Sequence, residues 1–183
     1  MKYAVAIDIG GTNTRVALID EKYKIEERAQ FSTDADNPDI TLFKIKQAIE
    51  RFDKEIVGVG MSCPGPLDLI EGKILTTPNL HGKWHGLCIT KELENLIHKP
   101  VYLENDANLA ALAEAIIGEG KEHNIVQYLT VSTGLGAGLV INKKVFQGAH
   151  GFANEVANVC LWDNGPSHGS IYPGGVEAIC SGT

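Results

Sequence analysis

Two short glycine-containing turns hold the residues of this chain that could bind phosphate. In the first, Asp8 stands near the end of an apolar run and is followed by Gly10 and Gly11; in the second, far downstream, Thr133 and Gly134 follow another apolar run. Glycine lets a ligand approach the backbone closely, and successive N–H groups in such turns bind anions. Together the two turns predict a site for the phosphate tail of a nucleotide.

The first turn lies between apolar runs at residues 3–9 and 16–19, so it is predicted to be a hairpin turn. It is not a P-loop, because no Gly-Lys-Ser/Thr sequence follows and no helical period begins there. In an ordinary hairpin, Asp8 would bond to its own backbone, and this alternative stays open. A carboxylate at the end of a buried strand needs a cationic or donating partner, for which Mg²⁺ is suited.

Composition places the chain among ordinary globular proteins and excludes some partners. Its 183 residues, 44% of them hydrophobic and 21% charged, can form one domain or two small ones. The net charge of -7 argues against a nucleic-acid or anionic-membrane surface. No apolar run is long enough to span a bilayer, and Met1 leads directly into a core strand rather than a signal peptide. We therefore expect a cytoplasmic location.

The apolar pattern predicts strands that alternate with helices. We expect strands at residues 2–9, 14–19, 25–31, 56–61, 101–104, 126–132 and 139–141, and helices after Pro38, around Leu93 and at 107–117. Phosphate turns that follow strands, rather than opening helices, indicate the actin-like ATPase architecture, which is related to ribonuclease H. The predicted fold class is therefore α/β, with a mixed sheet and flanking helices.

Four motifs stand in the order seen in the ROK family, which the chain resembles over nearly its whole length. They are Asp8–Thr12, Cys63–Asp68, Glu104–Asn108 and Ser132–Gly138. The family contains sugar kinases and sugar-responsive repressors. The resemblance implies two lobes: residues 1–118 with the first phosphate turn and the catalytic aspartate, and residues 119–183 as the start of a larger, incomplete C-terminal lobe.

The resemblance implies specific roles for the residues of these motifs. Asp106 would be the base that accepts the proton of a sugar hydroxyl, and Asp8 would hold Mg²⁺ directly or through water. The backbone of the two turns would face the phosphates of ATP, at Gly10, Gly11, Thr12, Thr133 and Gly134. The alternative for Asp106 is a capping role at the start of the helix that follows it.

Sugar recognition by carboxylates and amides is implied for a second set of residues. It comprises Asn79, Asn105, Asp106, Glu155 and Glu177. Each of them has an alternative as a solvated loop residue or as an acidic residue at a helix start. Glu177 in particular suits the first turn of a helix because of the helix dipole.

The chain departs from the family at its zinc motif. Many members carry a histidine where this chain has Asn158, and three thiolates where it has His168, Ser170 and Gly175. The four cysteines, Cys63, Cys88, Cys160 and Cys180, are scattered and form no disulfide or zinc-ribbon pattern. A tetrahedral site needs four N or S donors, so we expect no structural zinc and a loop held by packing and turn hydrogen bonds.

The resemblance implies an ATP- and Mg²⁺-dependent kinase that phosphorylates a hexose or an N-acylated hexosamine on its 6-hydroxyl. Glucose is the first candidate substrate and N-acetylmannosamine the second. The alternative is a non-catalytic sugar-binding or regulatory protein; a repressor would carry a helix-turn-helix ahead of the Asp8 strand, for which we expect no room. An unrelated actin-like ATPase is disfavoured by Glu155 and by the Glu104–Asn108 motif. Family members tend to form homodimers and generally continue well beyond the segment that ends this chain.

Overall fold

Alternating side chains build the first hairpin of the chain. The computed structural model describes residues 1–77, 79–169 and 171–182. In β1 (Tyr3–Ile9) every second residue is buried, and the residues between them are partly exposed on the other face. β1 pairs antiparallel with β2 (Asn13–Asp20) up to the pair of Ile9 with Thr14. The predicted hairpin turn is therefore confirmed.

A five-stranded mixed sheet grows from this hairpin, in the order β3-β2-β1-β4-β7. β3 (Ile25–Ser32) pairs antiparallel with β2, while β4 (Ile56–Cys63) and β7 (Val101–Asn105) extend the other side in parallel with β1. The carboxyl ends of β1, β4 and β7 consequently meet at one edge, the usual place for a ligand site in such sheets.

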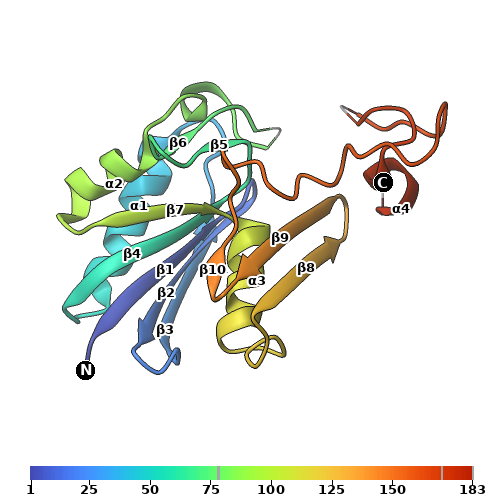
Figure 1. Ribbon diagram of the computed structural model, residues 1–183. Coiled ribbons are helices and arrows are strands. Elements are labelled where there is room, and N and C mark those ends of the chain that lie inside the picture. Colours follow the sequence, from blue (N-terminus) through green and yellow to red (C-terminus); the bar gives the residue numbers. More distant parts are fainter. Residues whose placement is uncertain (78, 170, 183) are drawn as a thin grey trace. The chain divides into compact units, whose positions relative to one another are not determined.

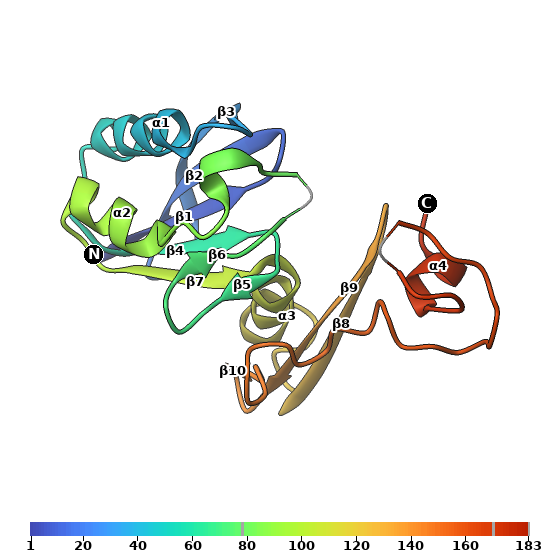
Figure 2. The ribbon, with the colours of Figure 1, turned by 90° about the horizontal axis from the view of Figure 1, so that it is seen from above.

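Helices α1 (Pro38–Arg51) and α2 (Ile89–Ile97) cover one face of this sheet (Figures 1 and 2). Pro38 suits the first turn of α1 because it needs no hydrogen-bond acceptor there, and the Asn37 side chain accepts from Asp39 N at 3.2 Å. The apolar sides of both helices and the buried side chains of the strands form one continuous core.

Three short elements follow β4 and rest on the same core. β5 (Leu67–Asp68) and β6 (Lys73–Ile74) form a two-stranded ribbon, and the 3-10 helix η1 (Gly82–Trp84) follows. Trp84 is fully buried, and its Nε1 donates to Asp34 O at 2.9 Å. The indole therefore anchors this polar stretch of the chain.

The contacts of the chain divide it into two units, Met1–Asp106 and the segment from Ala107 onward. The expected lobe boundary at residue 118 lies inside the second unit. This unit holds α3 and a three-stranded antiparallel sheet, in the order β10-β9-β8. Its elements are α3 (Asp106–Ile116), whose first residue belongs to the first unit, β8 (Ile125–Val131), β9 (Leu135–Ile141), β10 (Lys144–Val145) and α4 (Val176–Cys180).

Small residues let α3 pack closely on the sheet of the second unit. A Cβ atom built on Gly138 would lie 2.6 Å from Ala107 O and 2.8 Å from Ala111 Cβ. Ala111, Ala115 and Val140 form the centre of this core. A larger residue at position 138 would therefore push the helix off the strand.

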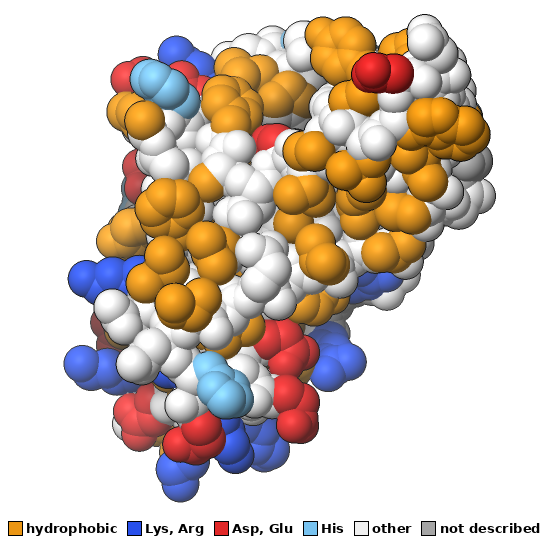
Figure 3. Space-filling model, turned by 45° about the vertical axis from the view of Figure 1, so that its right-hand side comes forward, with side chains coloured by type: hydrophobic (Ala, Val, Ile, Leu, Met, Phe, Trp, Pro, Cys, Tyr) orange, Lys and Arg blue, Asp and Glu red, His pale blue; other side chains and the backbone are white. Residues whose placement is uncertain are grey.

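Strand β8 exposes three large hydrophobic side chains. Ile125, Leu129 and Val131 are 66%, 57% and 58% exposed. The space-filling view shows several groups of hydrophobic side chains on the face that it draws (Figure 3). Among the described residues, no helix is long and apolar enough to cross a membrane.

Candidate active site

A row of polar side chains crosses four strands near the edge where β1, β4 and β7 end. Asp8 in β1 pairs with Arg15 in β2 and with Ser62 in β4. Ser62 pairs in turn with Glu104 in β7. Residues that lie side by side in neighbouring strands project to the same face of a sheet. The register therefore places these four side chains next to one another.

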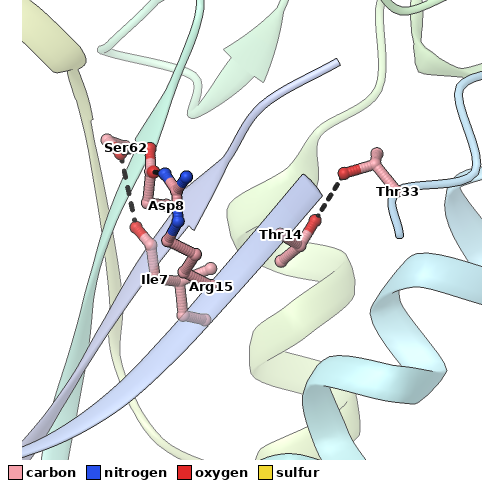
Figure 4. A network of polar contacts seen from close by, with 6 residues as sticks. All are labelled: Ile7, Asp8, Thr14, Arg15, Thr33 and Ser62. Atoms are coloured by element: carbon pink, nitrogen blue, oxygen red, sulfur yellow. Dashed lines mark hydrogen bonds and ion pairs between the residues drawn. The ribbon is translucent and has the colours of Figure 1, made fainter. Parts of the chain in front are cut away.

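The Asp8 carboxylate accepts a hydrogen bond on each of its oxygens (Figure 4). Ser62 Oγ lies 2.8 Å from Oδ1, and Arg15 Nη1 lies 2.9 Å from Oδ2. Ser62 is buried, whereas the side chains of Arg15 and Asp8 are 62% and 47% exposed. One carboxylate oxygen is thus held inside the sheet, and the other faces solvent with an exposed cation on it.

The chemistry of Asp8 fits magnesium that arrives with phosphates. Mg²⁺ is commonly bound by one or two carboxylates together with water and phosphate oxygens. Among the described residues, no group of three or more His, Cys, Asp or Glu side chains is arranged to hold a metal ion. A half-exposed carboxylate beside a phosphate turn can supply the protein's share of such a site.

The first glycine turn presents backbone donors two residues after Asp8. Gly10 N donates to Asn13 O at 2.9 Å and closes the turn. Across the described part of the chain, no acceptor is bound to the N–H groups of Gly11 and Thr12. Gly10 therefore shapes the turn, while Gly11 and Thr12 offer donors to an anion.

Asn79 lies directly against this turn. A Cβ atom built on Gly11 would be 2.5 Å from Asn79 Cβ and 3.0 Å from its carbonyl oxygen. Asn79 N is itself fixed by Thr77 Oγ1, at 3.3 Å. The structure thus brings together a residue predicted to bind sugar and a residue predicted to bind phosphate.

Asn105 and Asp106 follow β7 at the same edge of the sheet. Asn105 pairs with Cys63, the last residue of β4, and Asp106 is exposed at the first position of α3. Burial raises the pKa of the Cys63 thiol to about 12, and the charges of Asp106 and Asp8 add to this rise. Both carboxylates therefore lie close enough to Cys63 to act on it, Asp8 from β1 and Asp106 from the end of β7.

The second glycine turn joins β8 to β9 and contacts α4. Leu135 N donates to Glu177 Oε2 at 2.6 Å, and Gly182 N donates to Ser132 O at 2.7 Å. Within the described residues, the N–H groups of Thr133 and Gly134 have no acceptor. Glu177 therefore stabilises the turn through Leu135, and the N–H groups of Thr133 and Gly134 can donate to a ligand.

Glu155 is exposed in the long segment between β10 and α4. Its backbone N donates to Phe152 O at 3.4 Å. The predicted site residues thus fall into two sets. Those from Asp8 to Asp106 belong to the first unit, whereas Thr133, Gly134, Glu155 and Glu177 belong to the second.

Hydrogen bonds hold the loop in which many family members would have zinc. Asn158 Oδ1 accepts from Tyr172 N at 3.2 Å. Leu161 N donates to Gly174 O at 2.9 Å, and Val176 N donates to Val159 O at 3.0 Å. Of the positions matched to the thiolates, His168 and Gly175 are in the described part of the chain, and Ser170 lies outside it.

Sequence reasoning missed Arg15 and Ser62. Arg15 could have been found by counting through the short hairpin turn, since Asp8 then falls opposite residue 15. No comparable signal exists for Ser62, because the register of parallel strands joined by a long connection cannot be read from the sequence.

Comparison with known proteins supports the motif analysis. A sequence model of the ROK family matches residues 4–183. The chain belongs to the ROK family. This ROK chain is 33% identical to a glucokinase from Thermotoga maritima, over 98% of the chain and 57% of the glucokinase. It is 29% identical to a xylose repressor from Bacillus subtilis, over 90% of the chain and 44% of the repressor. The chain therefore spans about half the length of these relatives.

Solved structures of ROK proteins share the architecture. A ROK hexokinase from Thermus thermophilus has a TM-score of 0.89 and 33% identity, over 98% of this chain and 60% of the hexokinase. A ROK family glucokinase from Streptomyces griseus, in complex with glucose and AMPPNP, has a TM-score of 0.79 and 28% identity. The match covers 98% of this chain and 57% of the glucokinase. The predicted actin-like ATPase fold, a mixed sheet with flanking helices, is thereby confirmed.

Proposed function

We propose that the protein to which this chain belongs is an ATP-dependent sugar kinase. The observation that carries this proposal is the meeting of Asp8, Gly11 and Asp106 at one edge of the five-stranded sheet. A carboxylate for the metal, a turn that binds phosphate and a base beside the hydroxyl are the parts that phosphoryl transfer needs. Similarity to a glucokinase and a hexokinase supports this reading.

Asp106 acts as the base in this proposal. Its carboxylate accepts the proton of a sugar hydroxyl, and the hydroxyl oxygen forms a bond to the γ-phosphorus of ATP. The bond between that phosphorus and the bridging oxygen breaks, and ADP leaves with the electron pair. The exposure of Asp106 supports the role, because a base has to reach the hydroxyl within hydrogen-bond distance.

Backbone N–H groups bind the phosphates. Gly11 and Thr12 are the proposed donors of the first turn. The same role is proposed for Thr133 and Gly134 in the second turn. Asp8 holds magnesium, with Ser62 fixing the orientation of its carboxylate. When bound, magnesium neutralises charge on the phosphate oxygens.

The sugar is a hexose phosphorylated on its 6-hydroxyl, with glucose as the first substrate and N-acetylmannosamine as the second. Asn79 and Asn105 are assigned to its hydroxyls, and the same role is proposed for Glu155 and Glu177. The position of Asn79 against the phosphate turn supports its part in this set. Glu177 already accepts from Leu135 N, so its second carboxylate oxygen is the one assigned to the sugar.

A coupled ADP-release assay tests this function. The panel contains glucose, N-acetylmannosamine, mannose, fructose and 6-deoxyglucose, and ³¹P NMR identifies the product. We expect ADP release with glucose and none with 6-deoxyglucose, which lacks the accepting hydroxyl. Equal ADP release with both sugars would contradict transfer to the 6-hydroxyl.

A second candidate is a non-catalytic, sugar-binding regulator. The similarity to a xylose repressor over 90% of the chain favours it. A regulator binds sugar without releasing ADP, so calorimetry beside the coupled assay separates the two functions. Sugar binding with no turnover across the panel would favour the regulator.

A further inference from the structure

Arg15 holds Asp8 in a way that differs from the contact made by Ser62. Ser62 is 7% exposed and donates from the neighbouring strand, so its hydrogen bond is part of the sheet. The Arg15 side chain is 62% exposed and reaches Asp8 Oδ2 from the solvent side. The first contact is rigid, and the second can be exchanged.

The exchangeable contact occupies the oxygen that faces solvent. Asp8 has only two oxygens, and Ser62 holds Oδ1 (Figure 4). A divalent cation that binds Asp8 Oδ2 comes close to the Arg15 guanidinium, and the repulsion between the two positive charges favours displacement of the arginine. Exposed ion pairs are weak, since they change an equilibrium by about twofold to fivefold.

The first turn, where phosphates are proposed to bind, lies close to Arg15 in the sequence. Arg15 stands three residues after Thr12, whose N–H group has no acceptor in the described part of the chain. A guanidinium donates two parallel hydrogen bonds to a phosphate, as it does to a carboxylate. The same movement that frees Asp8 can thus bring Arg15 onto the phosphates at the first turn.

We propose that Arg15 is a positioning residue that exchanges partners when a metal-bound triphosphate enters. Without ligand, Arg15 neutralises Asp8; with ligand, the divalent cation takes Asp8 Oδ2 and Arg15 moves to a phosphate oxygen. Ser62 keeps the Asp8 carboxylate in place through the exchange. This inference rests on the proposed function, because it assumes that the first turn receives phosphates.

A purely structural role for Arg15 predicts something different. If the ion pair only tied β1 to β2, its loss would lower the melting temperature and weaken every ligand alike. The exchange predicts opposite effects on two ligands. Removing the guanidinium strengthens binding of a bare cation, because the competitor is gone, and weakens binding of a bare polyphosphate, because a donor is lost.

The test uses the whole chain with Mn²⁺ and inorganic tripolyphosphate as separate probes. Electron paramagnetic resonance of free Mn²⁺ gives the first affinity, and calorimetry gives the second. In Arg15→Gln we expect Mn²⁺ to bind about twofold to fivefold more tightly and tripolyphosphate about tenfold more weakly. Arg15→Lys keeps the positive charge but not the paired N–H donors of the guanidinium, so it should restore tripolyphosphate binding in part.

Arg28→Gln is the matched control, because Arg28 is an exposed arginine of β3 whose loss removes the same charge from the sheet. Its two affinities should stay within twofold of the unsubstituted chain. If the affinities of Arg15→Gln for Mn²⁺ and tripolyphosphate fall together or do not change, the exchange is wrong. The kinase proposal is not affected by that result. An unsubstituted chain that binds neither probe overturns both.

Discussion

Gly11 and Asn79 lie so close together that no side chain at position 11 would fit between them. A Cβ atom at Gly11 would be 2.5 Å from Asn79 Cβ, well inside van der Waals contact. This contact joins the phosphate turn after β1 to the segment that follows the β5–β6 ribbon. It gives Gly11 a reason for being glycine that does not depend on its backbone angles.

Gly11→Ala should therefore displace Asn79 and disturb both ligands. We expect affinity for MgATP and for glucose to fall by about tenfold each, as measured by calorimetry, because the turn or the asparagine has to shift. Gly60→Ala is the control: Gly60 lies in the same sheet, and a Cβ there meets nothing within 4 Å. Equal affinities in Gly11→Ala and the unsubstituted chain would refute the contact.

Lys143 should contribute strongly to the stability of the second unit. Its Nζ lies within hydrogen-bond distance of four backbone carbonyls at and beyond the end of α3, at 2.6 to 3.3 Å, so its three N–H groups are shared among them: Ala115, Gly120, Lys121 and His123. Lys143→Met leaves these carbonyls without their charged donor and should lower the free energy of unfolding by about 1–3 kcal/mol in urea. The neighbouring Lys144→Met should change it by less than about 0.5 kcal/mol.

Cys63 should resist thiol reagents in the folded protein. With its pKa raised to about 12 by burial and by two nearby carboxylates, its thiolate is about a thousandfold rarer at pH 8 than that of an ordinary cysteine. Ellman's reagent should label the exposed Cys160 and Cys180 quickly, and Cys63 only after unfolding. Rapid labelling of Cys63 in the native chain would contradict its burial.

The same pKa predicts a pH dependence of stability. Because the pKa of Cys63 in the folded state lies above the ordinary thiol value of 9.0, the stabilisation is present below pH 9 and is lost as the pH rises toward 12. The difference in unfolding free energy between the unsubstituted chain and Cys63→Ala should therefore shrink over this range. A difference that stays constant from pH 8 to 11 would contradict the shift.

The loop from 158 to 175 should keep its structure without metal. Asn158 accepts from Tyr172 N, so Asn158→Ala should make the Tyr172 amide exchange hydrogen several-fold faster in mass spectrometry. EDTA should leave the exchange of the unsubstituted chain unchanged. About one tightly bound zinc per chain would refute this account of the loop.

Most strands and helices of the first unit could be predicted from the spacing of their apolar residues, which has a period of two in strands and about 3.6 in helices. β1, β2, β3 and α1 lie within one or two residues of their expected positions. β9 was expected to begin at 139 and begins at Leu135, because Gly136 and Gly138 interrupt its apolar pattern. The two-residue strands β5, β6 and β10 were missed, since such short segments carry no period.

The site could be predicted only as far as local motifs reach. Asp8, Gly11 and Asp106 stand in motifs that the sequence displays, and their meeting follows from the parallel order of β1, β4 and β7. The hydrogen bond between Leu135 and Glu177 joins residues that are far apart in the sequence, so no local pattern could have predicted it.

The central claim is that Asp106 removes the proton from the sugar hydroxyl, and Asp106→Asn tests it most directly. Asparagine keeps the size and polarity of the side chain but cannot accept the proton. We predict that kcat for glucose-dependent ADP release falls by about 10²–10⁴, while calorimetry gives glucose and ATP affinities within about threefold of the unsubstituted protein. A kcat that stays within tenfold of the unsubstituted value would contradict the account.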